Sequence, residues 1–308
     1  MTALSRRDFL STAAATAAAA SLAPAAFADH HKEAGGKPFR ISLAQWSLHR
    51  KLKAGELDNL DFAKVAREEF DISGVEYVNQ FFKDKAKDES YLSRMKQAAE
   101  DHGVTSVLIM VDGEGRIGDP DTKKRLQTVE KHKKWVDAAK FLGCHSVRVN
   151  AGSEGSWEQQ RDHAADGLRR LGEYADGQGI NVLVENHGGL SSNGEWLAST
   201  LAYADHPRVG SLPDFGNFRI DRQTGENFDR YLGTELLMPF AKAVSAKTYG
   251  FDADGNESTM DYPRLMGIVL DAGYHDWVGI EWEGGDPGEY EGIKLTKQLL
   301  ERVRESAA

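Results

Sequence analysis

Short apolar runs alternate with amphipathic stretches along most of the chain, and each apolar run ends in polar residues. Helical patterns that end near a glycine are followed by β-branched runs at residues 74–79, 103–112, 143–150 and 179–185. Continuous apolar runs are typical of parallel strands buried on both faces, and a glycine after a helix suits a left-handed C-cap. The pattern therefore predicts a repeated helix–strand unit.

The number of these units predicts a closed barrel. The strand candidates are residues 41–44, 74–79, 103–112, 143–150, 179–185, 209–212, 243–246 and 277–281. Helical patterns lie between them, for example at residues 92–102, 122–142, 159–174 and 262–272. Eight units fit a single-domain α/β fold of the (β/α)8 TIM barrel type better than an open doubly wound sheet, which usually has fewer. The first predicted strand is followed by QWSLHR rather than a glycine-rich loop, which disfavours nucleotide binding.

The N-terminus has the pattern of an export signal. Two arginines, Arg6 and Arg7, precede an apolar run at residues 10–22, then Pro24 and a small-residue site that ends at Ala28. The run is shorter than the roughly 20 residues that a membrane-spanning helix needs. We therefore predict three parts: a twin-arginine signal peptide at residues 1–28, a flexible lead-in at 29–38 and the barrel at 39–308. A periplasmic or otherwise exported protein, handled by the twin-arginine export machinery, follows from this interpretation.

The net charge limits the classes of binding partner, and the cysteine content limits the sources of stability. A formal net charge of −10 argues against nucleic acid, whose phosphates attract a basic face. The sequence after Ala28 has no further apolar stretch of spanning length, so we expect no membrane contact once the signal is removed. Cys144 is the single cysteine and excludes an intramolecular disulfide, so stability must come from an ordinary core. A homo-oligomer stays open.

Three carboxylates end predicted strands that are neighbours or near-neighbours around the ring: Glu185 on strand five, Asp214 on strand six and Glu281 on strand eight. The active site of such a barrel forms at the carboxyl ends of its strands, so these side chains should converge. Converging carboxylates repel one another unless a cation neutralises them. Oxygen ligands suit magnesium or manganese, and a histidine ligand would favour zinc or cobalt. A metal-free sugar site, with Glu185 and Glu281 paired to Arg148 or Lys247, is the open alternative.

The other polar strand ends are candidates for sugar contacts. The expected substrate-binding residues are Gln45, Trp46, His49, Glu76, Asn79, Asn150, His187 and Asn217. Asp112 and Glu114 are left open between substrate contact and turn formation. Glu283 is expected to meet a loop or solvent.

The strand-end motifs resemble the xylose isomerase-like family of sugar phosphate isomerases and epimerases. The resemblance spans about residues 40–301 and is carried by VENHGG at 184–189, PDFGN at 213–217 and GIEWEG at 279–284. It implies that Glu185, Asp214 and Glu281 bind one divalent metal ion. A further ligand in that family is a strand-seven histidine in a His-x-Lys-Asp setting.

This chain reads VSAKT at residues 244–248, so Ser245 replaces the family's histidine and only Lys247 of that motif remains. Three alternatives are open. Water or substrate could complete the metal site, His187 or His49 could supply the fourth ligand, or the Lys247 ammonium could take over the electrostatic work of the metal.

These residues predict an exported enzyme of the sugar isomerase or epimerase type, which transfers a proton at the carbon next to a carbonyl. Glu185 and Glu281 are the expected proton-transfer pair, with Lys247 stabilising the developing oxyanion. The sequence does not choose among epimerisation, isomerisation and elimination. A sugar lyase or dehydratase on the same barrel and a non-catalytic sugar-binding barrel stay open. The sequence shows no clear phosphate-binding cluster, which favours a free or oxidised sugar such as a keto-sugar.

Overall fold

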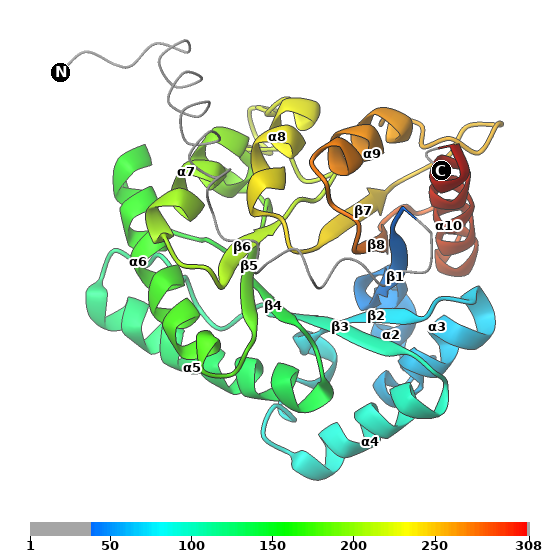
Figure 1. The fold of residues 1–308 in the computed structure, drawn as a ribbon, viewed down its shortest axis with the longest axis horizontal. Helices are drawn as coiled ribbons and strands as arrows, with labels where there is room; N and C mark the ends of the chain where they lie inside the picture. The colour runs from blue at the N-terminus through cyan, green and yellow to red at the C-terminus, as the bar shows by residue number, and fades with distance from the viewer. Residues whose placement is uncertain (1–37, 307–308) are drawn as a thin grey trace. The chain divides into compact units, whose positions relative to one another are not determined.

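The computed structural model describes residues 38–306, which form eight parallel strands surrounded by helices (Figure 1). The strands are β1 (Arg40–Ala44), β2 (Gly74–Val78), β3 (Thr105–Met110), β4 (Ser146–Val149), β5 (Asn181–Glu185), β6 (Val209–Leu212), β7 (Val244–Thr248) and β8 (Trp277–Trp282). The predicted signal peptide and nearly all of the predicted lead-in lie outside the described residues. The (β/α)8 barrel predicted from the sequence is confirmed.

The strands pair in the order β6-β5-β4-β3-β2-β1-β8-β7, so the first and last strands of the chain are neighbours. The remaining seam lies between β7 and the segment that follows β6. There the Ser245 amide donates to the Pro213 carbonyl at 2.9 Å, and the Phe215 amide donates to the Ser245 carbonyl at 3.1 Å. A parallel bridge joins Asp214 to Ser245 at the same point. The closing seam therefore fixes Asp214 beside β7.

The longer helices alternate with the strands and pack outside them (Figure 1). They are α2 (His49–Ala54), α3 (Phe62–Phe70), α4 (Glu89–Asp101), α5 (Thr122–Leu142), α6 (Trp157–Asp176), α7 (Gly194–Ala204), α8 (Arg230–Leu237), α9 (Tyr262–Asp271) and α10 (Glu289–Ser306). Side-chain caps begin several of them, because the first amides of a helix have no partner within it. Asp121 accepts from two amides at the start of α5, and Ser156 with Gln159 forms a capping box at the start of α6. None of the helices within residues 38–306 is long and apolar enough to span a membrane.

One predicted glycine cap is wrong. Gly143 ends α5 with φ of 81°, as expected, but Gly74 lies inside β2 and Asp71, with φ of 50°, ends α3. A Cβ built on Gly74 would lie 2.5 Å from the Trp277 ring, so the glycine admits that ring instead of ending a helix.

The seventh strand also differs from its predicted bounds. It runs from Val244 to Thr248 rather than over residues 243–246, and all five of its residues are buried. Alternate residues of a strand point to the same side, so Ser245 and Lys247 face one way. This register places Lys247 within the barrel wall, beside the residues of the candidate site.

Candidate active site

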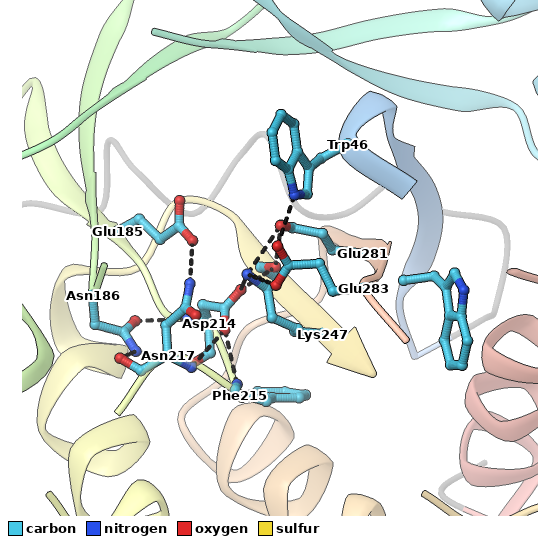
Figure 2. A network of polar contacts seen from close by, with 12 residues as sticks. Trp46, Glu185, Asn186, Asp214, Phe215, Asn217, Lys247, Glu281 and Glu283 are labelled. Carbon is cyan, nitrogen blue, oxygen red and sulfur yellow. Dashed lines mark hydrogen bonds and ion pairs between the residues drawn. The ribbon is translucent and has the colours of Figure 1, made fainter. Parts of the chain in front are cut away.

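Glu185, Asp214 and Glu281 form a buried group at one end of the barrel, which we call the acid triad (Figure 2). Glu185 ends β5, Asp214 follows β6 and Glu281 lies in β8. One carboxylate oxygen from each lies within 4.8 Å of the others. The structure thus brings together the three carboxylates that the sequence selected.

Glu185 is held from two sides. Its Oε1 accepts a hydrogen bond from Asn217 Nδ2 at 2.8 Å, and its Oε2 lies 2.8 Å from Arg148 Nε. Both atoms of the second contact are buried, and neither has a hydrogen-bond partner among the described residues. The contact is therefore an ion pair whose geometry does not make a hydrogen bond. Burial by itself would raise the pKa of Glu185, but the nearby positive charges, that of Arg148 foremost, together outweigh it and hold that pKa below its ordinary value.

Asp214 is fixed by backbone and hydroxyl donors. Its Oδ1 accepts from the amides of Gly216 at 2.8 Å and Asn217 at 2.9 Å, and its Oδ2 accepts from Ser245 Oγ at 2.7 Å. The Asn186 side chain pairs with both the amide and the carbonyl of Asp214. Burial, reinforced by the neighbouring carboxylates, raises the pKa of Asp214 to about 8.

Lys247 is the cation next to the triad. Its Nζ lies 3.0 Å from Glu281, 3.3 Å from Glu283 and 3.5 Å from Asp214 (Figure 2). Burial would lower the pKa of Lys247, but the surrounding carboxylates raise it well above its ordinary value. Burial also raises the pKa of Glu281, against the effect of Lys247. The lysine therefore stays charged and shares one positive charge among three acids.

The prediction that Glu283 meets a loop or solvent is wrong. Residues two apart at the end of a strand point to the same side, so Glu283 follows Glu281 towards the site. Besides Lys247, its carboxylate accepts a hydrogen bond from Trp46 Nε1 at 2.8 Å. Its side chain is 31% exposed, whereas those of Glu281 and Asp214 are 5% and 0% exposed, so Glu283 is the outermost acid of this cluster.

A second polar arm extends from Glu185 along β4. Arg148 Nη1 donates to Asp112 at 2.7 Å, and Asn150 Nδ2 donates to the same oxygen at 2.7 Å. Burial would raise the pKa of Asp112, but Arg148 holds it well below its ordinary range. Asp112 thus belongs to the arm that fixes Arg148. Glu114 turns outward instead, accepting from Trp135 Nε1 at 2.8 Å and pairing with Lys134 at 2.7 Å.

Three predicted substrate contacts are buried in the barrel and bonded to it. Gln45 accepts from the Val78 amide and donates to Asn59, and Asn79 pairs with the backbone of Asp112 through both ends of its amide. Glu76 accepts from Ser42 Oγ at 2.6 Å inside the barrel. Their polar groups join strands and loops of the wall, and their role in sugar binding stays a prediction.

The other predicted contacts are more accessible. Trp46 is half-buried and stacks on His49 with ring centroids 4.7 Å apart, Asn150 and Asn217 are half-buried, and His187 is exposed. The group of described residues able to hold a metal contains no histidine. His49 and His187 therefore lie outside the acid triad as the structure describes it, and a fourth ligand from either of them stays a prediction.

The donor set of the triad fits a hard divalent cation. All three side chains are buried carboxylates, and such oxygens are the ligands that magnesium and manganese prefer. Within the described residues, Glu185 Oε2 is a buried acceptor without a hydrogen bond. The triad could accordingly hold a metal ion, with Lys247 as a competing neighbour.

Comparison with known proteins agrees with this fold. The family model described as "xylose isomerase-like TIM barrel" matches residues 62–306, which is most of the chain. The chain therefore belongs to the xylose isomerase-like TIM barrel family.

Two curated relatives are similar over short stretches. The C-glycoside deglycosidase alpha subunit of Arthrobacter globiformis is 39% identical over 77 residues, which are 23% of this chain and 22% of that protein. The 3'-dehydrocarminate deglycosidase alpha subunit of a Microbacterium species is 32% identical over 73 residues, 22% of this chain and 20% of the relative. The chain thus spans about a fifth of the length of the curated relatives it matches.

Solved structures show the same fold at low identity. The 3-keto-D-glucoside 4-epimerase of E. coli has a TM-score of 0.67 and 15% identity, covering 86% of this chain and 99% of its own. A Mycobacterium smegmatis barrel in complex with magnesium has a TM-score of 0.65 and 17% identity, covering 89% and 98%. The IOLI protein with a bound zinc atom has a TM-score of 0.68 and 15% identity, covering 87% and 98%.

Proposed function

We propose that this chain is an enzyme that moves a proton at the carbon next to the carbonyl of a keto-sugar. The observation that carries the proposal is the buried acid triad with the Lys247 ammonium 3.0 Å from Glu281 and 3.5 Å from Asp214. Buried acids gathered beside a cation at the mouth of such a barrel suit chemistry in which negative charge develops on a substrate oxygen. The name of the E. coli epimerase, which specifies a 3-keto-glucoside, supports this substrate class.

In this proposal the two glutamates of the acid triad transfer protons, and Lys247 stabilises the negative charge that develops. One of the two glutamates, Glu185 or Glu281, takes the proton. The electron pair of the broken C–H bond forms a carbon–carbon double bond, and the π pair of the carbonyl moves to its oxygen to give the enediolate. The other returns a proton to the opposite face, which gives the epimer. Lys247 places positive charge near the developing oxyanion. A divalent ion held by Glu185, Asp214 and Glu281 would stabilise the same negative charge. Magnesium and zinc in related barrels support this cofactor class.

Elimination is the second candidate reaction, and the deglycosidase names of both curated relatives favour it. It begins with the same proton removal. The electron pair then forms a double bond to the neighbouring carbon, and the substituent on that carbon leaves with the electrons of its own bond. In a glucoside oxidised at carbon 3, removal of the carbon 2 proton would expel the aglycone from carbon 1.

One experiment tests proton transfer and separates the two outcomes. The purified protein is incubated in heavy water with a 3-keto-glucoside whose aglycone absorbs light. We expect deuterium at a carbon next to the carbonyl, measured by proton NMR. An epimerised sugar identifies an epimerase, and release of the aglycone identifies a lyase. Binding of the sugar without any exchange above the buffer rate would reject the enzyme and favour a sugar-binding barrel.

We also propose that the protein is exported by the twin-arginine pathway, on the basis of Arg6, Arg7 and the apolar run that follows. We expect the mature protein in the periplasmic fraction of cells with this pathway and the full-length chain in the cytoplasm of cells lacking its translocase. Substitution of both arginines by lysine should likewise leave the full-length chain in the cytoplasm. Normal export in either case would contradict the proposal.

A further inference from the structure

Lys247 lies next to the acid triad and contacts the carboxylates that a divalent ion would use. Its Nζ contacts two of the three triad acids, Glu281 at 3.0 Å and Asp214 at 3.5 Å. The lysine side chain is buried to 98% of its surface, as its exposed fraction is 2%. A divalent ion held by the triad would share these two carboxylates with the ammonium.

Ser245 links the same two acids through its hydroxyl. Its Oγ lies 2.7 Å from Asp214 Oδ2 and 3.2 Å from Glu281 Oε2. A hydroxyl has one proton to donate, so it ties these carboxylates together without neutralising them. Lys247 is the cation that faces these two acids, whereas Glu185 is paired with Arg148 at 2.8 Å. Lys247 is thus a cation that the protein itself places against two of the three triad acids, Asp214 and Glu281.

Two cations a few ångströms apart repel strongly in a buried site, so metal binding and the present position of Lys247 oppose each other. A lysine side chain is long and flexible, and an alternative carboxylate lies within reach. Glu283 is already 3.3 Å from Lys247 Nζ, does not belong to the triad and is the outermost of the acids. Trp46 Nε1 fixes it with a 2.8 Å hydrogen bond. Movement of the ammonium towards Glu283 would free Asp214 and Glu281.

We propose that Lys247 is a built-in competitor for the divalent ion, and that Glu283, held by Trp46, receives its ammonium when the ion binds. This inference rests on the metal site of the proposed function and extends it. The site then has two states: in one, Lys247 lies against Asp214 and Glu281, and in the other, the divalent ion does. Metal affinity is set by the free-energy difference between these states.

Calorimetric titration of the chelator-treated protein with Mn²⁺ tests the competition directly. We expect Lys247→Met to bind Mn²⁺ at least about tenfold more tightly than the wild type, because the competing charge is gone. Lys134→Met is the matched control, since it removes a lysine paired with Glu114 away from the triad, and it should leave the affinity unchanged. Equal or weaker binding by Lys247→Met overturns the proposal, and so does the absence of Mn²⁺ binding in both proteins.

A second variant tests the receiving role of Glu283 and retains the lysine. Glu283→Gln should weaken Mn²⁺ binding about tenfold in the wild-type background and no more than about threefold in the Lys247→Met background. Equal effects in both backgrounds would show that Glu283 adds only its charge, which overturns its assigned role. If Lys247→Met folds poorly, the Mn²⁺-induced rise in melting temperature replaces calorimetry, and it should be larger than in the wild type.

The outcomes separate this inference from the proposed function. Wild type that exchanges deuterium into a keto-sugar, together with unchanged affinity in Lys247→Met, would leave the function in place and reject the competition. Tighter Mn²⁺ binding in Lys247→Met without exchange in the wild type would do the reverse.

Discussion

Glu185→Gln and Glu281→Gln are each expected to lower turnover of a keto-sugar by about 10² to 10⁴, the usual effect of losing a general acid or base. Glutamine keeps the size of the side chain and an oxygen acceptor, so sugar binding should weaken but remain measurable. Glu185 and Glu281 are brought within a few ångströms of each other by β5 and β8, across the segment that carries Asp214. In heavy water, the two variants should differ in which epimer still exchanges its proton.

Glu114→Gln is the matched control for these variants. It is the same chemical change in a buried glutamate at a strand end, but that carboxylate turns away from the triad towards Trp135 and Lys134. Its turnover should stay within about twofold of the wild type. Metal content is measured for every variant, so that loss of an ion is distinguished from loss of a base. If both triad variants exchange protons like the wild type, the glutamates act as ligands only, and His187 becomes the first residue to test as the base.

The sequence predicts the barrel well because its strands carry a strong local signal. Apolar runs such as those of β3 and β5 are buried on both faces and end in polar residues, so they can be read without knowledge of the neighbours. Helix α5 was predicted with the bounds observed, since Asp121 and Gly143 mark its two ends. The helix cap predicted at Gly74 is wrong because the glycine is required by a residue far away in the sequence: the Trp277 ring of β8 leaves no room for a Cβ.

The triad was also predictable, because the strand-end rule needs only the order of the strands. The partners of the triad depend on side-chain direction, which the periodicity of one strand does not supply. Gln45 and Asn79 follow strands, yet Gln45 bonds to the Val78 amide of β2 and Asn79 bonds to the Asp112 backbone after β3. Arg148 carried a usable signal, since a charged residue within a buried strand must find a partner. Glu283 could have been found from the period of two that links it to Glu281.

Glu76→Gln is expected to change how stability depends on pH. Burial raises the pKa of Glu76 from 4.5 to about 8, and one of its oxygens is buried without a hydrogen-bond partner among the described residues. Between these two values the unfolded chain has released the proton, whereas the folded protein still binds it. The contribution of Glu76 to stability therefore falls as pH rises from about 4.5 and levels off above about 8. Glutamine has no proton to release and removes this dependence.

Relative to the wild type, Glu76→Gln should gain roughly 2 to 4 kcal/mol in free energy of unfolding between pH 5 and pH 9, since one unit of pKa corresponds to about 1.4 kcal/mol. Urea unfolding across this range measures the difference, and subtraction cancels other groups that titrate in the same window, such as Asp214. Glu130→Gln, an exposed glutamate on α5, is the control and should run parallel to the wild type. A parallel curve for Glu76→Gln as well would mean that Glu76 is ionised in the folded protein. The expected gain would mean that Glu76 is neutral in the folded protein, so that it adds no further negative charge to a barrel that already holds the acid triad.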